Sequence, residues 1–300
     1  MKLISVLILA SLFVGCSSAP KKAKEEVHKP ITPNIVKEIT EGVLHPESIV
    51  YSQKHTAYFV SNIASGNPTE TKAVGYIAKY ARDGKLIKAK WVTGLHAPKG
   101  IVIVGDFLYV SDVTRVQKIS IPKAKIVKTF TVKDSKFLND LVVDNAGNIY
   151  VSDMWTDIIY RIHKDKIAIW AQDPKIAGSN GLFTDGKEHI LAVRWGTEID
   201  MKTWQSKNIG DMAMISLKDP KVIHTNTDIR GHLDGIAVDA SGMLWISDWL
   251  NGDIYTMEKN GKVRKMFNLG VGAADLTVIK ELNVLIVPQM NQNKIIFIQL

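Results

Sequence analysis

The chain has 300 residues, of which 46% are hydrophobic and 23% are charged, a composition that excludes extended disorder and predicts a folded globular protein. The formal net charge of +8 comes from lysines scattered along the sequence. Without a nucleic-acid-binding motif, this basic balance predicts a solvated surface and no nucleic-acid partner. The single cysteine, Cys16, excludes a disulfide within the chain.

Residues 1–15 have the form of a signal peptide. An apolar run from Leu3 to Val14 follows Lys2, and it is too short to span a bilayer. The run leads into Val14-Gly15-Cys16, which resembles a bacterial lipobox, and this resemblance implies cleavage before Cys16 and lipidation of its sulfur. Phe13 stands where leucine is commonest, so an ordinary signal peptide cut at a nearby small residue is the alternative.

Residues 16–34 follow as a polar, charged segment with three prolines, which predicts a flexible tether. Together with lipidation at Cys16, the tether predicts an exported protein of the bacterial cell envelope that faces the periplasm. We expect contact with the membrane through the lipid anchor only. The remaining residues, 35–300, are assigned to one domain.

This domain repeats one pattern six times: a polar pair, an apolar run, a tight turn and a second apolar run. The clearest copy runs from Leu138 to Asp153, where β-branched and aromatic residues flank an Asn/Gly-rich turn, and this is typical of a β-hairpin. The six polar pairs begin at Glu47, Lys99, Asn139, Asn180, Asp234 and Ala274.

The first five copies are each followed by two more strand candidates, and the spacings between polar pairs are 52, 40, 41, 54 and 40 residues. Four antiparallel strands per repeat of this size predict an all-β fold, a six-bladed β-propeller. The sixth repeat lacks its fourth strand, and Ile35 to Thr40 is a strand candidate that belongs to no repeat. We expect this N-terminal strand to close the ring. An open solenoid of six units is the alternative, but it leaves that strand unexplained.

In a propeller the innermost strands line a central channel, so the first residues of the polar pairs should form a ring at its mouth. Glu47, Asn139, Asn180 and Asp234 would present oxygen there, and such a set suits Ca²⁺ or another hard divalent cation. The alternative is turn chemistry at strand entries, with Lys99 neutralising a carboxylate. Turn chemistry does not require Glu47, however, and two close carboxylates are costly without a cation.

Two other groups recur around the hairpins. The Ser-Asp endings recur too regularly to be a site, and we expect their carboxylates to accept hydrogen bonds from turn amides at Asp112, Asp153 and Asp248. The residues expected to wall the pocket mouth are Trp155, Arg194, Trp195 and Trp249, and the tryptophans expected in the core are Trp91, Trp170 and Trp245.

The domain resembles the family of the senescence marker protein (regucalcin) and gluconolactonase, with paraoxonase and diisopropylfluorophosphatase as more distant relatives. The segments that carry the resemblance are Pro46-Glu47, Phe137 to Asp140, Ser179 to Leu182 and Leu233 to Ile236. It implies one divalent metal, usually calcium, held by the glutamate, the Asn-Gly asparagine and the Asp-Gly aspartate, while Asn139 binds metal or substrate. Phe137 stands where the lactonases have a substrate-binding arginine, and Lys99 has no assigned counterpart.

Two functions are compatible with these features. The first is a calcium-dependent hydrolase of a lactone or related ester, with Asp234 assisting an attacking water and with Lys99, Asn139 and Arg194 contacting the substrate. The second is a non-catalytic propeller of the cell envelope that binds a small ligand or a protein partner around a structural cation. Both place a small molecule or partner at the channel mouth.

Overall fold

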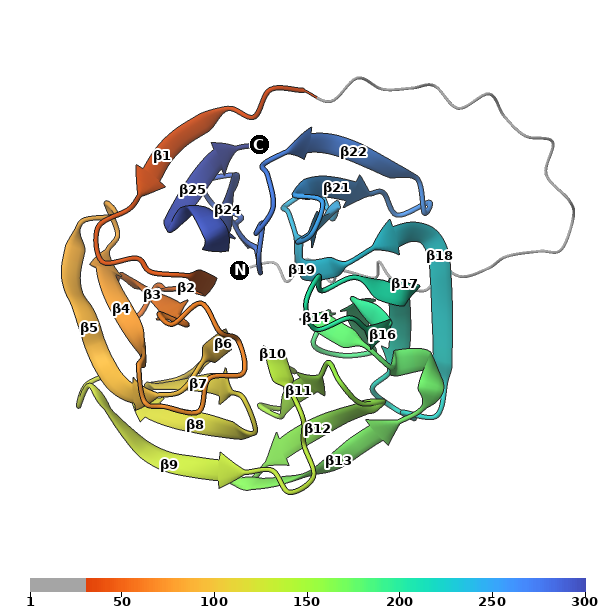
Figure 1. Cartoon of the computed structure of the whole chain (residues 1–300), viewed down its shortest axis with the longest axis horizontal. Coiled ribbons are helices and arrows are strands. Elements are labelled where there is room, and N and C mark those ends of the chain that lie inside the picture. The colour runs from red at the N-terminus through yellow and green to blue at the C-terminus, as the bar shows by residue number, and fades with distance from the viewer. Residues whose placement is uncertain (1–30) are drawn as a thin grey trace, which may run out of the picture.

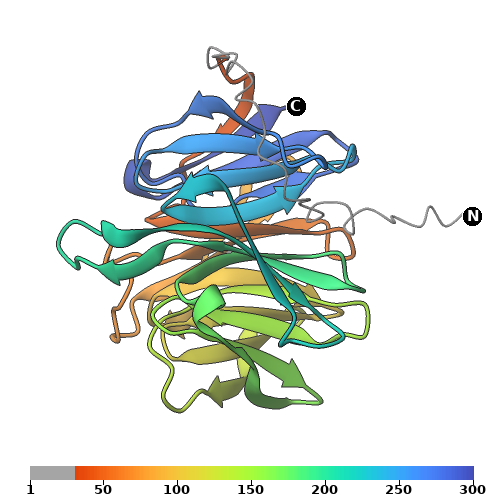
Figure 2. The same cartoon turned by 90° about the vertical axis from the view of Figure 1, so that its right-hand side faces the viewer.

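A computed structural model of the protein describes residues 31–300, so the predicted signal peptide, Cys16 and most of the predicted tether lie outside the described residues. The strands form six sheets arranged as blades around a central axis (Figure 1). Figure 2 shows the same ring edge-on. The fold is therefore the predicted all-β, six-bladed propeller. Within residues 31–300, no helix has the length and apolar character needed to cross a membrane.

Four blades are simple four-stranded meanders, ordered from the channel outward. Blade 1 contains β2 (Pro46–Ser52), β3 (Ala57–Asn62), β4 (Gly75–Ala81) and β5 (Leu86–Leu95). Blade 2 contains β6 (Pro98–Val104), β7 (Phe107–Asp112), β8 (Arg115–Ser120) and β9 (Lys125–Thr131). Blade 3 contains β10 (Leu138–Val143), β11 (Ile149–Asp153), β12 (Ile158–His163) and β13 (Lys166–Gln172). Blade 5 contains β19 (Leu233–Val238), β20 (Leu244–Asp248), β21 (Asp253–Met257) and β22 (Val263–Asn268).

Blade 6 is built from both ends of the domain. Its strands are β23 (Thr277–Ile279), β24 (Val284–Gln289), β25 (Lys294–Gln299) and β1 (Ile35–Ile39). β1 runs antiparallel to β25 with Ile39 opposite Ile295, and the Gln299 amide donates to the Asn34 carbonyl oxygen at 2.9 Å. The ring is thus closed by the N-terminal strand, as predicted, and the outer edge of β25 is paired.

Blade 4 departs from the predicted four strands. It contains β14 (Ser179–Thr184), β15 (His189–Arg194), β17 (Ser206–Ser216) and β18 (Ile223–Gly231), and an extra strand, β16 (Gly196–Ile199), pairs with the first part of β17. This added hairpin accounts for the longer spacing before the Asp234 repeat. Its sequence is mostly polar and lacks alternating hydrophobic residues, so periodicity gave no sign of it.

The hydrophobic core lies between neighbouring blades. One cluster, for example, joins Tyr58 and Val60 of blade 1 to Ile286 and Phe297 of blade 6. Because both faces of an inner strand are covered, β3 is buried along its whole length, whereas the outermost β9 alternates with solvent. The short 3₁₀ turns η1 (Pro174–Ile176) and η2 (Met290–Gln292) are the helical elements of the described residues. Buried inner strands thus surround the channel.

The carboxylates of the Ser-Asp endings do bind backbone amides. Asp153 accepts hydrogen bonds from the Lys136 and Phe137 amides at 2.8 Å, and one of its oxygens also accepts from the Trp155 amide at 3.3 Å. Asp112 accepts from the His96 and Ala97 amides in the same way, and Asp248 from the Asn251 amide. For Asp112 and Asp153, the amides belong mainly to the segment that enters the innermost strand, so these carboxylates fix the entry to the ring positions.

Candidate metal centre and binding cavity

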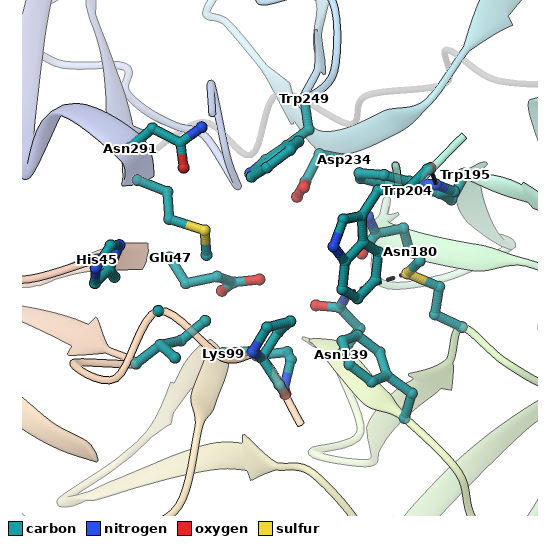
Figure 3. Close-up of a pocket in the computed structure, with 16 residues that line it drawn as sticks. His45, Glu47, Lys99, Asn139, Asn180, Trp195, Trp204, Asp234, Trp249 and Asn291 are labelled. Carbon is teal, nitrogen blue, oxygen red and sulfur yellow. Dashed lines mark hydrogen bonds between the residues drawn. The ribbon is translucent and has the colours of Figure 1, made fainter. Parts of the chain in front are cut away.

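The first residues of the polar pairs are turned into the channel by irregular strand pairing. Register shifts occur at the polar pair in five of the six innermost strands, namely β2, β6, β10, β14 and β19. Such bulges re-aim side chains. Five of the six side chains line a single cavity of about 120 Å³, shown in Figure 3: Glu47, Lys99, Asn139, Asn180 and Asp234. Ala274, at the sixth position, is buried and does not line it.

Glycine at the second position of a pair lets neighbouring inner strands approach closely. A Cβ atom on Gly181 would lie 2.0 Å from the Asp234 carbonyl oxygen, and one on Gly235 would lie 2.4 Å from the Leu276 amide nitrogen. Both distances are shorter than any real contact, so a side chain would push the strands apart. The Asn-Gly and Asp-Gly pairs therefore serve close packing around the channel and not only turns.

Two oxygen atoms of the ring have no hydrogen-bond partner among residues 31–300. Glu47 Oε2 and Asn180 Oδ1 are buried without a hydrogen bond, and the Asn180 amide nitrogen donates to the Leu233 carbonyl oxygen at 3.3 Å. A buried polar atom left unsatisfied costs about 1–3 kcal/mol. The Asn139 amide nitrogen contacts Met154 Sδ at 3.7 Å, so its carbonyl oxygen remains for a ligand. The set of carboxylate and amide oxygens fits a hard divalent cation such as Ca²⁺.

The charges in the channel favour the same conclusion. Burial, followed by the charges of Asp234 and Asp275, raises the pKa of Glu47, and burial followed by Asp275 raises the pKa of Asp234. Two more buried carboxylates lie at second positions of the polar pairs, Asp140 and Asp275, and burial raises the pKa of Asp275 to about 6. Glu47 and Asp234 thus line the cavity together with Lys99, and Asp140 and Asp275 are buried beside ring positions. A bound cation would favour the ionised forms of these carboxylates.

Lys99 is buried at the cavity wall, with 1% of its surface exposed. Its Nζ donates to the carbonyl oxygens of Pro68 at 2.8 Å and Ala97 at 3.0 Å and lies 4.3 Å from the centroid of the Phe137 ring. Burial lowers the pKa of Lys99 to about 8. Lys99 and Glu47 both belong to the described residues. They form no ion pair, since none of their N···O distances is within 4.0 Å. One of the three ammonium hydrogens remains for a ligand.

Asp140 and Asp275 were not among the predicted site residues. Asp140 accepts hydrogen bonds from the amides of Leu141 at 2.6 Å and of Leu182, in the next blade, at 2.7 Å. Asp275 accepts one from the Ser48 hydroxyl of blade 1 at 2.7 Å. Each of the two residues directly follows a ring position in the sequence. This adjacency was the signal by which the sequence could have placed them near the channel. The bonds to Leu182 and Ser48 link neighbouring blades.

Aromatic side chains form much of the cavity wall. The lining aromatic residues are Phe137, Trp195, Trp204 and Trp249. Trp195 and Trp249 were expected there, whereas Trp204 belongs to the unpredicted β16–β17 hairpin. Trp155 packs behind the wall, stacked on Phe137 with ring centroids 4.6 Å apart. Of the tryptophans expected in the core, Trp91 and Trp245 are buried and Trp170 packs partly buried against a core cluster.

The structure does not bring Arg194 to the cavity. Its Nε donates to Asp211 Oδ1 at 2.7 Å, and the two side chains form an ion pair within blade 4. The residue next to it, Trp195, lies between β15 and β16 and lines the cavity instead. Arg194 is therefore placed as a structural partner of Asp211, and the expected contact with a ligand in the cavity is not formed by this side chain.

The fold and the ring define a class: a six-bladed β-propeller with an oxygen-lined candidate cation site at one end of its channel. The model of the SMP-30/Gluconolactonase/LRE-like region family matches residues 45–277, and the chain belongs to this family. The matched range contains all four oxygen-bearing ring residues, so the resemblance inferred from the sequence is confirmed. A comparison with curated protein sequences finds no match.

Solved structures share the propeller at low sequence identity. A putative gluconolactonase superposes with a TM-score of 0.62 and 16% identity, covering 90% of this chain and 93% of the other. A catalytically inactive virginiamycin B lyase from Staphylococcus aureus with quinupristin gives 0.58 and 13%, covering 88% and 98%. Kuenenia stuttgartiensis hydrazine synthase gives 0.55 and 15%, covering 87% and 97%. At these identities the likeness shows the fold alone.

Proposed function

We propose that the protein is a divalent-metal-dependent hydrolase of a lactone or related ester, with calcium as the cation. The observation that carries the proposal is the pair of buried, unpartnered oxygens, Glu47 Oε2 and Asn180 Oδ1, in a cavity that they share with Asp234. Membership in the SMP-30/Gluconolactonase/LRE-like family supports it. Glu47, Asn139, Asn180 and Asp234 would hold the cation.

When bound, the cation supplies a Lewis acid for the substrate carbonyl group. The protein's own residues supply the rest. Asp234 takes a proton from the attacking water, whose oxygen forms a bond to the carbonyl carbon. The carbon–oxygen bond to the leaving oxygen then breaks, and the proton passes to the departing alkoxide. A lactone gives a hydroxy acid, and an ester gives an acid and an alcohol. The ionised Asp234 carboxylate, which lines the cavity, is the group that accepts and returns the proton in this exchange.

Lys99 and Asn139 have binding roles in this proposal. The free hydrogen of the Lys99 ammonium group can donate to the negative charge that develops on the substrate oxygens, and it lies in a buried site where such a bond is strengthened. The Asn139 side chain orients the substrate or completes the cation's coordination. Replacing Lys99 by methionine should lower turnover at saturating calcium, whereas calcium affinity changes alone if Lys99 only balances charge.

The test is a panel of lactones and esters, assayed with purified protein in calcium and again in excess chelator. Turnover that is lost in chelator and restored by calcium supports the proposal. Calorimetry on the chelated protein measures calcium binding separately, with one ion per chain expected. The absence of turnover in protein that binds calcium would show a non-catalytic role.

A non-catalytic propeller with a structural cation is the second candidate. Two observations favour it: Phe137 occupies the place of a substrate-binding arginine, and two of the three Lys99 donors are already taken by backbone carbonyls. In that case the cavity binds a small ligand or a partner segment without changing it. The same panel, read by calorimetry, distinguishes binding from turnover.

The N-terminal pattern supports a further part of the proposal: that the protein is exported and anchored in the bacterial cell envelope through a lipidated Cys16, facing the periplasm. The apolar run stops at Gly15 and the charged segment begins at once. Mass spectrometry of the membrane fraction should find Cys16 as the first residue and acylated. A mature chain that begins elsewhere with an intact thiol would contradict it.

A further inference from the structure

A cluster of metal-ligand side chains lies at the end of blade 4 that is remote from the channel cavity. β14 starts beside Asn180, which lines the cavity, and ends at Thr184, so the turn to β15 is at the opposite end of the blade. This turn brings together Asp185, Glu188 and His189, with one ligand atom of each within 4.8 Å of the others. None of these three side chains lines the channel cavity.

The cluster contains a buried imidazole nitrogen without a partner. His189 Nδ1 is inaccessible to solvent and makes no hydrogen bond with residues 31–300. Buried polar atoms normally have a partner, so this nitrogen points to a missing ligand. Asp185 Oδ2 lies 3.8 Å from it, too far for a hydrogen bond. This gap suits an ion, because zinc bonds of roughly 2.0–2.2 Å allow two of its ligand atoms to lie up to about 4.2 Å apart.

The turn holds the Asp185 carboxylate in place as a ligand. Its Oδ1 accepts hydrogen bonds from the amides of Lys187 at 2.9 Å, Glu188 at 2.8 Å and His189 at 3.1 Å. Its Oδ2 accepts none from the described residues and faces His189. Carboxylates that bind metals are usually oriented by such outer hydrogen bonds. One oxygen therefore fixes the carboxylate, and the other remains for a cation.

The two carboxylates of the cluster are not paired with a basic side chain. Across residues 31–300, no lysine or arginine nitrogen lies within 4.0 Å of the Asp185 or Glu188 carboxylate. A second histidine shows the opposite arrangement. His55 Nε2 lies 3.0 Å from Asp106 Oδ1, but Lys54 Nζ lies 2.7 Å from the same oxygen. The lysine supplies the positive charge there, whereas the turn of blade 4 leaves that place to an external cation.

The donor atoms select the kind of metal. One imidazole nitrogen with two carboxylate oxygens suits zinc and neighbouring transition metals, whereas the all-oxygen ring of the channel suits calcium. Three protein ligands leave a fourth tetrahedral position for water. Solvent reaches the cluster, because Glu188 is exposed and Asp185 lines a cleft of about 440 Å³ between blades 4 and 5. Rotation of the exposed Glu188 side chain brings its carboxylate the remaining distance to an ion.

We propose that Asp185, Glu188 and His189 form a second metal site, which binds one zinc-class divalent ion at the end of blade 4 opposite the channel cavity. The ion connects the turn to the first residue of β15 and so stabilises the blade. The site shares no residue with the channel. It therefore stands apart from the proposed hydrolase, and neither depends on the other.

The test is isothermal titration of zinc chloride into protein kept in excess calcium. We expect one zinc ion per chain and a rise in melting temperature when zinc is bound. His189→Gln removes the nitrogen ligand and should weaken zinc binding by at least about tenfold. Glu188→Gln changes an exposed side chain, so it tests the site even if the histidine variant fails to fold. Wild-type protein that binds no zinc, or variants that bind it as tightly as wild type, would overturn the proposal.

Two controls locate the ion. His55→Gln removes a histidine that also lies beside a carboxylate, and zinc affinity should not change. Glu47→Gln weakens the channel site and should also leave zinc affinity unchanged. X-ray absorption at the zinc edge should show one imidazole nitrogen among oxygen ligands. Zinc affinity that falls in Glu47→Gln but not in His189→Gln would move the ion to the channel, and a spectrum with oxygen ligands alone would likewise count against the site.

Discussion

The polar pairs supply two rows of side chains around the channel. The first row consists of the first residues of the pairs, and the second row consists of the second residues. The first row contains Glu47 and Asn180, each with one buried oxygen that lacks a partner in the described part of the chain. The second row contains Asp140 and Asp275, whose carboxylates accept hydrogen bonds from neighbouring blades. Both rows are buried, and each contains carboxylates. The difference in satisfied hydrogen bonds, and not burial or charge, therefore separates a candidate binding site from a structural contact.

The largest effect should come from the first row. Asp234→Asn keeps the shape and an oxygen ligand but removes the basic group, so turnover at saturating calcium should fall by roughly 10²- to 10⁴-fold. The melting temperature of the metal-free protein should not fall, because a buried charge is removed. Steady-state kinetics with thermal denaturation checks both outcomes. Full activity in this variant would exclude Asp234 as the base.

The second row should show the reverse pattern. Asp140→Ala leaves the buried amides of Leu141 and Leu182 without an acceptor and should lower the free energy of unfolding by about 2–4 kcal/mol. Asp83→Ala is the control, since this exposed turn residue should change stability by about 0.5 kcal/mol or less. Denaturant unfolding measures both. A variant of Asp140 as stable as the control would show that this bond does not join the blades.

The pH dependence of stability involves both rows. Burial raises the pKa of Asp275 to about 6 from 3.8, so the folded protein binds this proton more tightly than the unfolded chain. The stabilisation is complete below about pH 4 and is lost as pH rises through 6, a loss of about 1–3 kcal/mol. The pKa values of Glu47, Asp140 and Asp234 are raised in the same direction.

Calcium should reverse this loss, because it binds the ionised carboxylates and stabilises the folded state by mass action. Urea unfolding between pH 4.5 and 7.5, with chelator or with calcium, checks the sign. We expect stability to fall with pH in chelator and to stay level or rise in calcium. Stability that rises with pH in chelator would contradict the assignment of these carboxylates as buried and uncompensated.

The smallest expected effect is a difference in calcium affinity between variants of two first-row residues. Asn139→Ala removes a neutral ligand and should weaken calcium binding several-fold, or roughly 1 kcal/mol. Glu47→Gln removes charge and should weaken it by more than tenfold, because charge count sets calcium affinity. Calorimetry on the two variants gives the ranking. Equal losses would indicate that the amide and the carboxylate do not share one ion.

Much of the fold follows from the sequence because its physical cause is local. Alternating side chains define the hairpins, and an unpaired strand such as Ile35 to Thr40 must find an edge, so the blade number and the closure were predictable. The ring positions followed from the same repeat, since an innermost strand can only border the channel. Five of the six predicted positions line the cavity. The sixth is Ala274, whose side chain has no oxygen or nitrogen atom that could bind a ligand.

The tertiary structure decided what depends on partners remote in sequence or on loop conformation. Arg194 pairs with Asp211 because β15 and β17 are neighbours, and Lys99 reaches the Pro68 carbonyl because the loop after β3 folds over it. Trp204 enters the wall through a polar hairpin that has no hydrophobic period. A repeat specifies where a strand runs, but the hydrogen-bond partner of a buried side chain is set by whichever backbone or side chain the folded ring brings within 3 Å.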